Sequence, residues 1–355
     1  MSEAGQSRST LFKALHGLGL LVAWAILAAA VSVRQPLAWR CALLLLGLGH
    51  VAAVWALVAG RTQKLTLLSF SLAALLLGVH VAFPGEFRGI QVRSSAGGPL
   101  RNWTNRLVPE STATVLAVPL LTLGGVISPT EAEGFSSALR QEYTRLSEAV
   151  GGVPPTPLIT TFTGGQSSQA FDVVTIRTGA SGRDSAIMLH GFGGNWLLLC
   201  WLVADALRDS VSVTVCPSSA VGAPWGSHDG RQTVLSIIRR LRDEGLNEPL
   251  LIGLSAGAVG ASELSQELPG EFRAAALLFG AATFRSTPHL PTLYVYGSQD
   301  ERFPVDFILE AASTHRSAGG ITRREIQSTH FGLVTARKEV QAALRAWVET
   351  LPRTP

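Results

Sequence analysis

Short apolar runs alternate with segments of helical spacing from about residue 155 onward, and this alternation restricts the fold more than any other feature. Runs such as "PLLIGLS" and "PTLYVYG" predict strands, and segments such as "DGRQTVLSIIRRLRDEG" predict amphipathic helices. Strands separated by helices of about 10–15 residues form βαβ units with parallel strands. Strands that are apolar throughout, such as "LLIGL", fit a sheet covered on both faces. The sequence therefore predicts an α/β fold with a mostly parallel sheet.

Eight strands are expected in this region, the first two of which are predicted to form a hairpin. They are "LITTF" (158–162), "FDVVTI" (171–176), "SAIMLHG", "VSVTVCP", "PLLIGLS", "AAALLFGA", "PTLYVYG" and "ITRREIQ". A further amphipathic helix is expected over 130–149, with Thr130 as N-cap and Glu133 completing a capping box. Asp229 is expected to cap the helix that follows it.

Three apolar segments without Asp, Glu, Lys or Arg precede this region, at about Leu15–Val33, Cys41–Ala59 and Leu65–Phe83. Each is close to the ~20 residues that a helix needs to cross a bilayer. A cleaved signal peptide could explain the first segment but not all three. We therefore expect three transmembrane helices in an integral protein of the cell membrane. The basic residues on the two sides are nearly balanced, so the orientation stays open.

The expected domain organisation has a membrane domain (1–83), a membrane-proximal linker (84–130) and a C-terminal α/β domain (131–355). The linker begins with a stretch rich in Gly, Ser and Arg that lacks periodicity. The apolar segment 111–127 within it is compatible with a strand, a membrane-surface segment or a poor fourth span. The hydrophobic content of 47% and the mean hydropathy of +0.29 agree with a membrane-associated chain.

The formal net charge of +4 does not indicate a nucleic-acid partner. The first 110 residues contain ten Lys and Arg against three acidic residues, whereas the remainder contains 19 against 22. The basic excess therefore belongs to the membrane-proximal third. Three cysteines exclude a disulfide-stapled scaffold and a zinc ribbon. Cys200 and Cys216 are either buried free thiols or a pair, and a bridge would indicate an oxidising compartment.

The pentapeptide Gly253-Leu254-Ser255-Ala256-Gly257 matches the pattern G-x-S-x-G. The pattern alone is weak, but here it ends a buried strand and opens a helix, as a nucleophile elbow requires. Glycine on either side of the serine permits a sharp turn. This context makes Ser255 a candidate nucleophile.

A serine hydroxyl needs a base and a group that orients the base. Asp300 follows the strand "PTLYVYG", and His330 follows the last strand. The order Ser, Asp, His and the position at the carboxyl ends of the strands fit this role. Glu301 and Asp306 remain alternatives for the acid.

A glycine-rich bend, "HGFGG" (190–194), follows the strand "SAIML". The backbone N–H groups of Phe192 and Ala256 are expected to form an oxyanion hole. His190 is expected to bond the loop backbone rather than to act in catalysis. Gly191, Trp196, Trp225 and Phe331 are the expected substrate contacts.

The chain resembles the α/β-hydrolase family over about residues 155–350. Four features carry the resemblance in chain order: the HG-x-GG loop at 190–194, the G-x-S-x-G elbow at 253–257, a G-x-x-D at Gly297–Asp300 and the late His330. The resemblance implies an eight-stranded, mostly parallel sheet, a Ser255–His330–Asp300 triad and an oxyanion hole from Phe192 and Ala256. Family members usually carry a cap after the sixth strand, and the short segment there implies that this cap is short or absent. The site is then expected to be open from above unless residues 107–150 cover it. No metal or organic cofactor is implied.

The predicted function is a membrane-anchored serine hydrolase that cleaves a carboxylic ester, thioester or amide of a small molecule or lipid. An acyltransferase that uses the same acyl-enzyme remains an alternative, as does a non-catalytic binding domain. The acyl chain, the leaving group and the oligomeric state are open.

Overall fold

The computed structural model describes residues 87–97, 103–106, 109–152, 154–268, 270–283, 290–314 and 320–352, with a few scattered positions between 41 and 78. The chain divides into two compact units. One comprises Met1–Gly85 with Ser111–Ala117, and the other comprises Glu86–Glu110 with Val118–Pro355. The second unit contains nearly all of the described elements.

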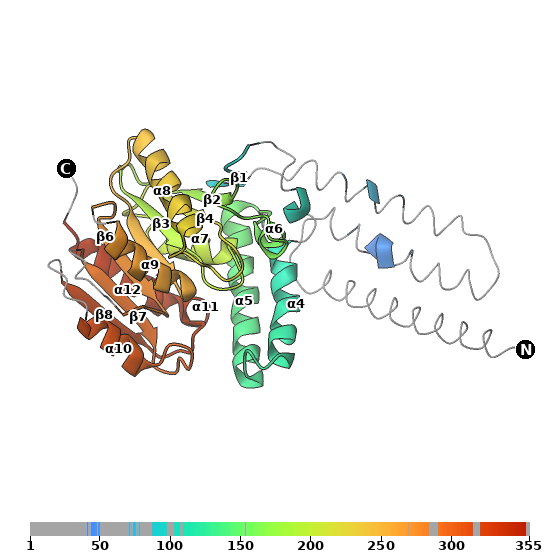
Figure 1. Ribbon diagram of the computed structural model, residues 1–355. Coiled ribbons are helices and arrows are strands. Elements are labelled where there is room, and N and C mark those ends of the chain that lie inside the picture. Colours follow the sequence, from blue (N-terminus) through green and yellow to red (C-terminus); the bar gives the residue numbers. More distant parts are fainter. Residues whose placement is uncertain are drawn as a thin grey trace, which may run out of the picture. The chain divides into compact units, whose positions relative to one another are not determined.

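An eight-stranded sheet forms the centre of the second unit, with the strand order β1-β2-β4-β3-β5-β6-β7-β8 (Figure 1). The first two pairings, β1 with β2 and β2 with β4, are antiparallel, and all later pairings are parallel. This is the sheet that the resemblance to α/β-hydrolases implied. The strands are β1 Ile90–Ser94, β2 Asp172–Arg177, β3 Ser185–Leu189, β4 Val213–Pro217, β5 Leu250–Leu254, β6 Ala274–Leu278, β7 Thr292–Gly297 and β8 Ile321–Ile326.

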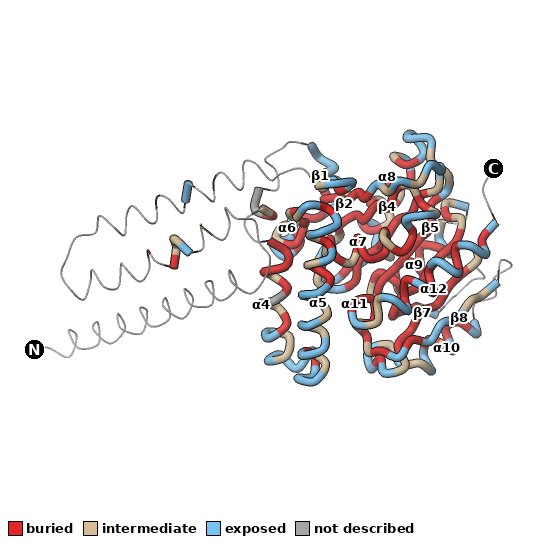
Figure 2. Tube along the Cα trace, turned by 180° about the vertical axis from the view of Figure 1, so that it is seen from behind, coloured by how far each residue is buried: buried red, intermediate tan, exposed pale blue. Residues whose placement is uncertain are grey.

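Successive residues of each central strand point to opposite faces of the sheet, and each face has its own apolar core. In β5, Leu250 and Ile252 contribute to one core, whereas Leu251 contributes to the other. Both faces are buried, as Figure 2 shows by the red interior of the sheet. This burial explains why the central strands are apolar throughout.

Helices cover the two faces separately. The core on the face that carries Ile252 includes residues of α5 Pro129–Val150, α7 Leu197–Ala206, α11 Gly332–Thr335 and α12 Arg337–Thr350. The face that carries Leu251 packs against α8 His228–Asp243, α9 Ala256–Glu267 and α10 Val305–Thr314. The remaining described helices are η1 Trp103–Arg106, α4 Glu110–Leu123 and α6 Leu158–Phe162.

The first strand of the sheet lies in the segment that was expected to be a linker. β1 (Ile90–Ser94) pairs with β2, so the predicted hairpin of 158–162 with 171–176 is wrong. Along β1, a buried Ile90 is followed by alternating exposed and half-buried residues. An edge strand of this kind needs few apolar residues, and its sequence is therefore hard to distinguish from a polar loop.

The segment "LITTF" is the short helix α6 rather than a strand. Its β-branched residues favour a strand, but Pro157 occupies the N-cap position with a φ of −66°. The side-chain Oδ1 of Asn105 accepts a hydrogen bond from the Thr160 N–H at 2.8 Å. Proline geometry and this tertiary contact override the local strand preference.

Two predicted helix caps are each two residues too far along the chain. Ser128, not Thr130, caps α5, because its Oγ accepts a hydrogen bond from the Glu131 N–H and Pro129 occupies the first helical turn. Ser227, not Asp229, caps α8 through the Gly230 N–H. In both places a serine precedes the predicted cap and satisfies the helix terminus first.

Residues 111–127 are mostly helical, since α4 runs from Glu110 to Leu123 with Pro119 inside it and ends at Gly124. Of the three alternatives for this segment, the strand is therefore excluded. The predicted spans 15–33, 41–59 and 65–83 lie outside the described residues, apart from scattered positions. Among the helices that the structure does describe, none combines the length and apolar character needed to cross a bilayer.

Glu110 is a buried carboxylate that caps the start of α7. Its two carboxylate oxygens accept hydrogen bonds from the backbone N–H groups of Leu197 and Leu198 at 2.7 and 2.9 Å, and from the Tyr143 hydroxyl at 2.9 Å. Burial raises the pKa of this carboxyl, and the hydrogen bonds act in the opposite direction.

Replacing Glu110 with glutamine is expected to lower the free energy of unfolding by about 2 kcal/mol. The glutamine NH₂ group would take the place of one carboxylate oxygen and would face buried hydrogen-bond donors, which it cannot satisfy. Thermal or urea unfolding measures the change. The exposed Glu133→Gln, on α5, is the matched control and should leave stability within about 0.5 kcal/mol of the parent. Equal stability of both variants would contradict the capping role.

Candidate active site

Ser255 lies at a sharp turn between β5 and α9. Its backbone has φ 56° and ψ −121°, a conformation that non-glycine residues rarely adopt. Neighbouring backbone approaches both flanking glycines closely. A Cβ at Gly253 would lie 2.3 Å from the Gly257 carbonyl oxygen, and one at Gly257 would lie 2.1 Å from the Leu189 carbonyl oxygen. The glycines of the G-x-S-x-G pattern are therefore required by packing.

Replacing Gly253 with alanine is expected to destabilise the domain by about 1–3 kcal/mol, since the added methyl meets backbone atoms that cannot move aside independently. Thermal unfolding of the variant measures this loss. Gly179→Ala is the control, because a Cβ there meets no atom within 4 Å. If both alanine variants unfold at the parent temperature, the packing argument for the elbow is wrong.

Two hydrogen bonds join the three residues that the sequence singled out. The distance between Ser255 Oγ and His330 Nε2 is 2.8 Å, and that between His330 Nδ1 and Asp300 Oδ2 is also 2.8 Å. All three residues follow the carboxyl ends of strands β5, β7 and β8. Asp300 is thus the acid that contacts the imidazole, and neither alternative, Glu301 or Asp306, is required for that role.

Asp300 is held in place by its own loop. Its second oxygen, Oδ1, accepts hydrogen bonds from the backbone N–H groups of Arg302 and Phe303 at 2.9 and 3.0 Å. The carboxyl side chain has no exposed surface. One carboxylate oxygen is thereby fixed by the backbone, and the other is directed at His330.

Aromatic rings enclose the imidazole of His330. The Phe303 ring stacks on it with a centroid distance of 5.8 Å, and the Phe331 ring contacts it edge-on at 5.8 Å. Phe303 was missed by the sequence analysis, although an aromatic residue three positions after the expected acid was an available signal. These rings limit the orientations of the imidazole and reduce its contact with water.

Residues 126–135 lie against the loops that carry the acid and the histidine. Arg302 donates a hydrogen bond to the Val126 carbonyl and forms an ion pair with Glu131 at 3.6 Å. The Phe135 ring stacks on that of Phe331 with centroids 4.2 Å apart. The start of α5 therefore borders the site beside His330, where residues 107–150 were considered as a cover.

The glycine-rich loop after β3 approaches the serine directly. A Cβ at Gly191 would lie 3.0 Å from the Ser255 Cβ, so the loop and the elbow are in close contact. Gly193 and Gly194 have positive φ values of 92° and 100°, which favour glycine. Phe192 is 73% exposed. Ala256 begins α9, where the first N–H groups have no acceptor within the helix.

His190 is fully buried and bonds the loop backbone, as the sequence predicted. Its Nε2 accepts a hydrogen bond from the Ser219 N–H at 2.9 Å, so the proton lies on Nδ1, which donates to the Gly191 carbonyl at 2.8 Å. Burial lowers the pKa of His190 to about 4. The ring is therefore neutral over the ordinary range of pH.

A cavity of about 740 Å³ opens beside Ser255. Of the four expected substrate contacts, only Trp225 is among its lining residues. The Trp196 indole N–H instead donates to the Gly193 carbonyl at 3.0 Å, while Phe331 packs between His330 and Phe135. Lining residues that the sequence analysis did not identify include Val259, Gly260, Glu263 and Ala282.

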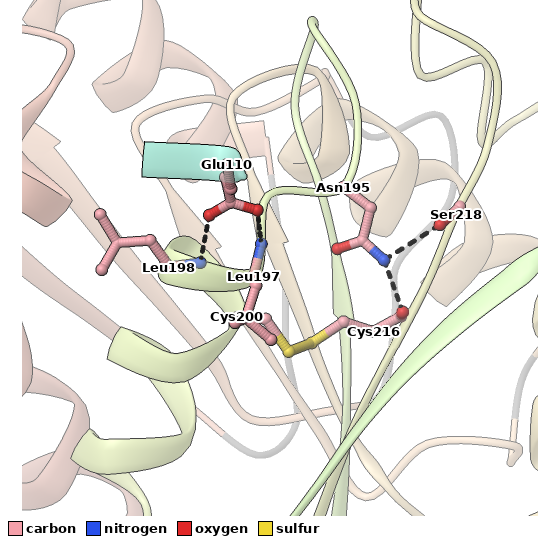
Figure 3. Close-up of a disulfide and its surroundings, with 7 residues drawn as sticks. All are labelled: Glu110, Asn195, Leu197, Leu198, Cys200, Cys216 and Ser218. Atoms are coloured by element: carbon pink, nitrogen blue, oxygen red, sulfur yellow. Dashed lines mark hydrogen bonds between the residues drawn. A yellow bond between two sulfur atoms is a disulfide. The ribbon is translucent and has the colours of Figure 1, made fainter. Parts of the chain in front are cut away.

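Cys200 and Cys216 form a disulfide, which decides between the two alternatives left open by the sequence. Figure 3 shows the bridge between α7 and the end of β4, beside Asn195 and the Glu110 cap. Both cysteines are buried.

Among the residues that the structure describes, no cluster of three or more His, Cys, Asp or Glu side chains could hold a metal ion. The expectation that no cofactor is needed stays a prediction.

Comparison with known proteins gives structural neighbours only. No family model matches the sequence, and no curated protein matches it. An esterase of Pyrococcus furiosus shares 13% identity with a TM-score of 0.44, over 51% of this chain and 88% of the esterase. A lid-less α/β serine hydrolase of Xanthomonas campestris shares 19% identity with a TM-score of 0.42, over 52% of this chain and 92% of the hydrolase. An α/β serine hydrolase homologue of Coxiella burnetii shares 17% identity with a TM-score of 0.41, over 50% and 91% of the two chains.

Proposed function

We propose that this protein is a serine hydrolase that cleaves a carboxylic ester through an acyl-enzyme on Ser255. The observation that carries the proposal is the chain of two 2.8 Å hydrogen bonds from Ser255 through His330 to Asp300, beside an open cavity. This arrangement of nucleophile, base and orienting acid is the one required for acyl transfer by a hydroxyl group.

In the first half of the reaction, Ser255 Oγ attacks the ester carbonyl carbon while its proton passes to His330 Nε2. The tetrahedral intermediate collapses, the bond to the leaving oxygen breaks, and His330 gives that oxygen the proton. In the second half, His330 takes a proton from water, the hydroxide attacks the acyl-enzyme, and the acid leaves as the proton returns to Ser255. Asp300 keeps the imidazole oriented and stabilises its protonated form.

We assign the stabilisation of the negative charge that develops on the carbonyl oxygen to hydrogen bonds from the backbone N–H groups of Phe192 and Ala256. Support for Ala256 comes from its place at the first turn of α9, where the helix dipole favours an anion. Support for Phe192 comes from the close approach of its loop to Ser255. Two such donors would lower the barrier substantially, because the loss of one typically costs ~3–4 kcal/mol.

Anchoring to a membrane is part of the proposal. It is supported by three uncharged apolar segments within residues 15–83 and makes lipid esters suitable substrates alongside soluble ones. The Cys200–Cys216 disulfide supports a catalytic domain in an oxidising compartment. Resistance of the full chain to extraction from membranes by alkaline carbonate, with release by detergent, is the expected result. Complete release by carbonate would contradict the anchor.

A panel of esters from acetate to palmitate, assayed with the detergent-solubilised full chain, tests the proposed activity. Release of free acid that rises with enzyme concentration is expected for at least one chain length. Each assay is repeated with added alcohol, so that the ratio of free acid to new ester separates a hydrolase from an acyltransferase. A folded protein that cleaves no ester and reacts with no fluorophosphonate would contradict both the hydrolase and the acyltransferase. The non-catalytic binding domain would then be the remaining alternative.

A further inference from the structure

The loop that supplies the Phe192 N–H is attached at both of its ends to one neighbouring segment. We call residues 190–196, between β3 and α7, the oxyanion loop, and residues 216–221, at the end of β4, the β4 exit. Glycines at 191, 193 and 194 make the oxyanion loop intrinsically adaptable. A flexible loop can hold a donor in a fixed position only if other contacts restrain it.

The start of the oxyanion loop is attached through His190. Its Nε2 accepts the Ser219 N–H of the β4 exit, and its carbonyl oxygen accepts the indole N–H of Trp225 at 2.9 Å. In the middle of the loop, the Gly193 N–H donates to the Val221 carbonyl at 2.9 Å. These contacts lie on both sides of Phe192, whose own side chain is largely exposed and gives it little packing.

The end of the oxyanion loop is attached more strongly, by a side chain and a covalent bond. Asn195 is 1% exposed, and its Nδ2 donates to the Cys216 carbonyl at 2.7 Å and to Ser218 Oγ at 3.1 Å (Figure 3). One turn into α7, Cys200 is bonded to the same Cys216. Cys216 thus holds the oxyanion loop through its backbone and holds α7 through its side chain.

This double attachment is additional to the contacts that already join α7 and β3 to the rest of the domain. The helix start is already satisfied by Glu110, which accepts the N–H groups of Leu197 and Leu198. The sheet contact is already made, because β3 pairs with β4. The disulfide lies in the buried core, and together with the two hydrogen bonds of Asn195 it sets the separation between the oxyanion loop and the β4 exit.

We propose that Asn195 and the Cys200–Cys216 disulfide are positioning residues for catalysis, which fix the Phe192 N–H at the place where the oxyanion develops. The proposal rests on the proposed hydrolase function. A displacement of the loop by about 1 Å weakens a hydrogen bond made in the transition state and costs up to about 10²-fold in rate. It leaves the binding of the uncharged ester nearly unchanged.

The test compares Asn195→Ala and the double variant Cys200→Ala/Cys216→Ala with the parent enzyme. Each is assayed for kcat and KM on the best ester and for inhibition by a trifluoromethyl ketone. Ser255 Oγ adds to the carbonyl carbon of this inhibitor while His330 Nε2 takes the serine proton, and the carbonyl π-electron pair moves to the oxygen, which becomes an oxyanion. Both variants are expected to lose about 10–10²-fold in kcat with KM changed less than threefold, and to bind the ketone more weakly in the same proportion.

Asn247→Ala is the matched control. Its side-chain amide donates to Asp184 Oδ1 at 3.0 Å, just before the opposite end of β3, so it also loses an amide hydrogen bond at this strand. It should lower stability while kcat and ketone affinity both stay at the parent values. Asn195→Ala and the double cysteine variant remove different contacts, so either one tests the proposal if the other fails to fold. Melting curves identify the variants that fold.

Parent-like kcat and ketone affinity in a folded variant would overturn the positioning role. A loss of stability alone would also overturn it, because the contacts would then be merely structural. If the parent enzyme itself cleaves no ester, the proposed function fails instead, and the two failures are thereby distinguished.

Discussion

Ser255→Ala is expected to remove ester hydrolysis almost completely, by about 10⁶-fold in kcat, because nothing else at the elbow can form the acyl-enzyme. The hydroxyl is the group that forms the hydrogen bond with His330 Nε2, at 2.8 Å. Alanine keeps the backbone and the helix start, so the fold should be preserved. Initial rates on the preferred ester and labelling by a fluorophosphonate probe measure the loss.

Ser313→Ala is the control for this experiment, since Ser313 is exposed on α10 and bonds only the Glu310 carbonyl of its own helix. It should retain both activity and labelling. Persistent labelling of the Ser255→Ala protein would show that another residue is the nucleophile. In that case the triad assignment would be wrong even if the enzyme were a hydrolase.

Asp300→Asn is expected to lower kcat by about 10⁴-fold with little change in KM. The asparagine Oδ1 can keep the hydrogen bonds from the Arg302 and Phe303 N–H groups, which directs its NH₂ group at His330 Nδ1. The imidazole must then carry its proton on Nε2. That nitrogen can no longer accept the proton of Ser255, although the geometry is unchanged.

The measurement is a set of steady-state rates for the Asp300→Asn and Glu301→Gln proteins at neutral pH. Glu301 is exposed and adjacent to the acid, so its amide variant controls for the loss of a charge in this loop. Comparable losses in both variants would point to general electrostatics rather than to the tautomer. A parent-like Asp300→Asn enzyme would exclude Asp300 as the orienting acid.

The core of the candidate site was predictable because each part follows a strand and carries a local signal. Ser255 sits between glycines, and Asp300 and His330 follow apolar strands in the expected order. Parallel strands bring their carboxyl ends together, so chain order was enough to predict proximity. The 2.8 Å hydrogen bonds agree with that prediction.

The remaining features depend on contacts that no local pattern reveals. β1 was missed because one buried isoleucine is enough for an edge strand, and α6 was misassigned because Asn105 and Pro157 act against strand propensity. Which face of α9 lines the cavity depends on how the helix packs, so Val259 could not be singled out. The pairing of Cys200 with Cys216 depends on the distance between α7 and β4 and stayed open for the same reason.

The backbone of Ser255 also limits which nucleophiles this site could ever employ. Threonine carries the same hydroxyl, but its branched Cβ is strongly disfavoured at a φ of 56°. Cysteine has an unbranched Cβ and can occupy the turn without added strain. The geometry of the elbow therefore restricts substitution at this position to an oxygen or sulfur nucleophile on an unbranched side chain.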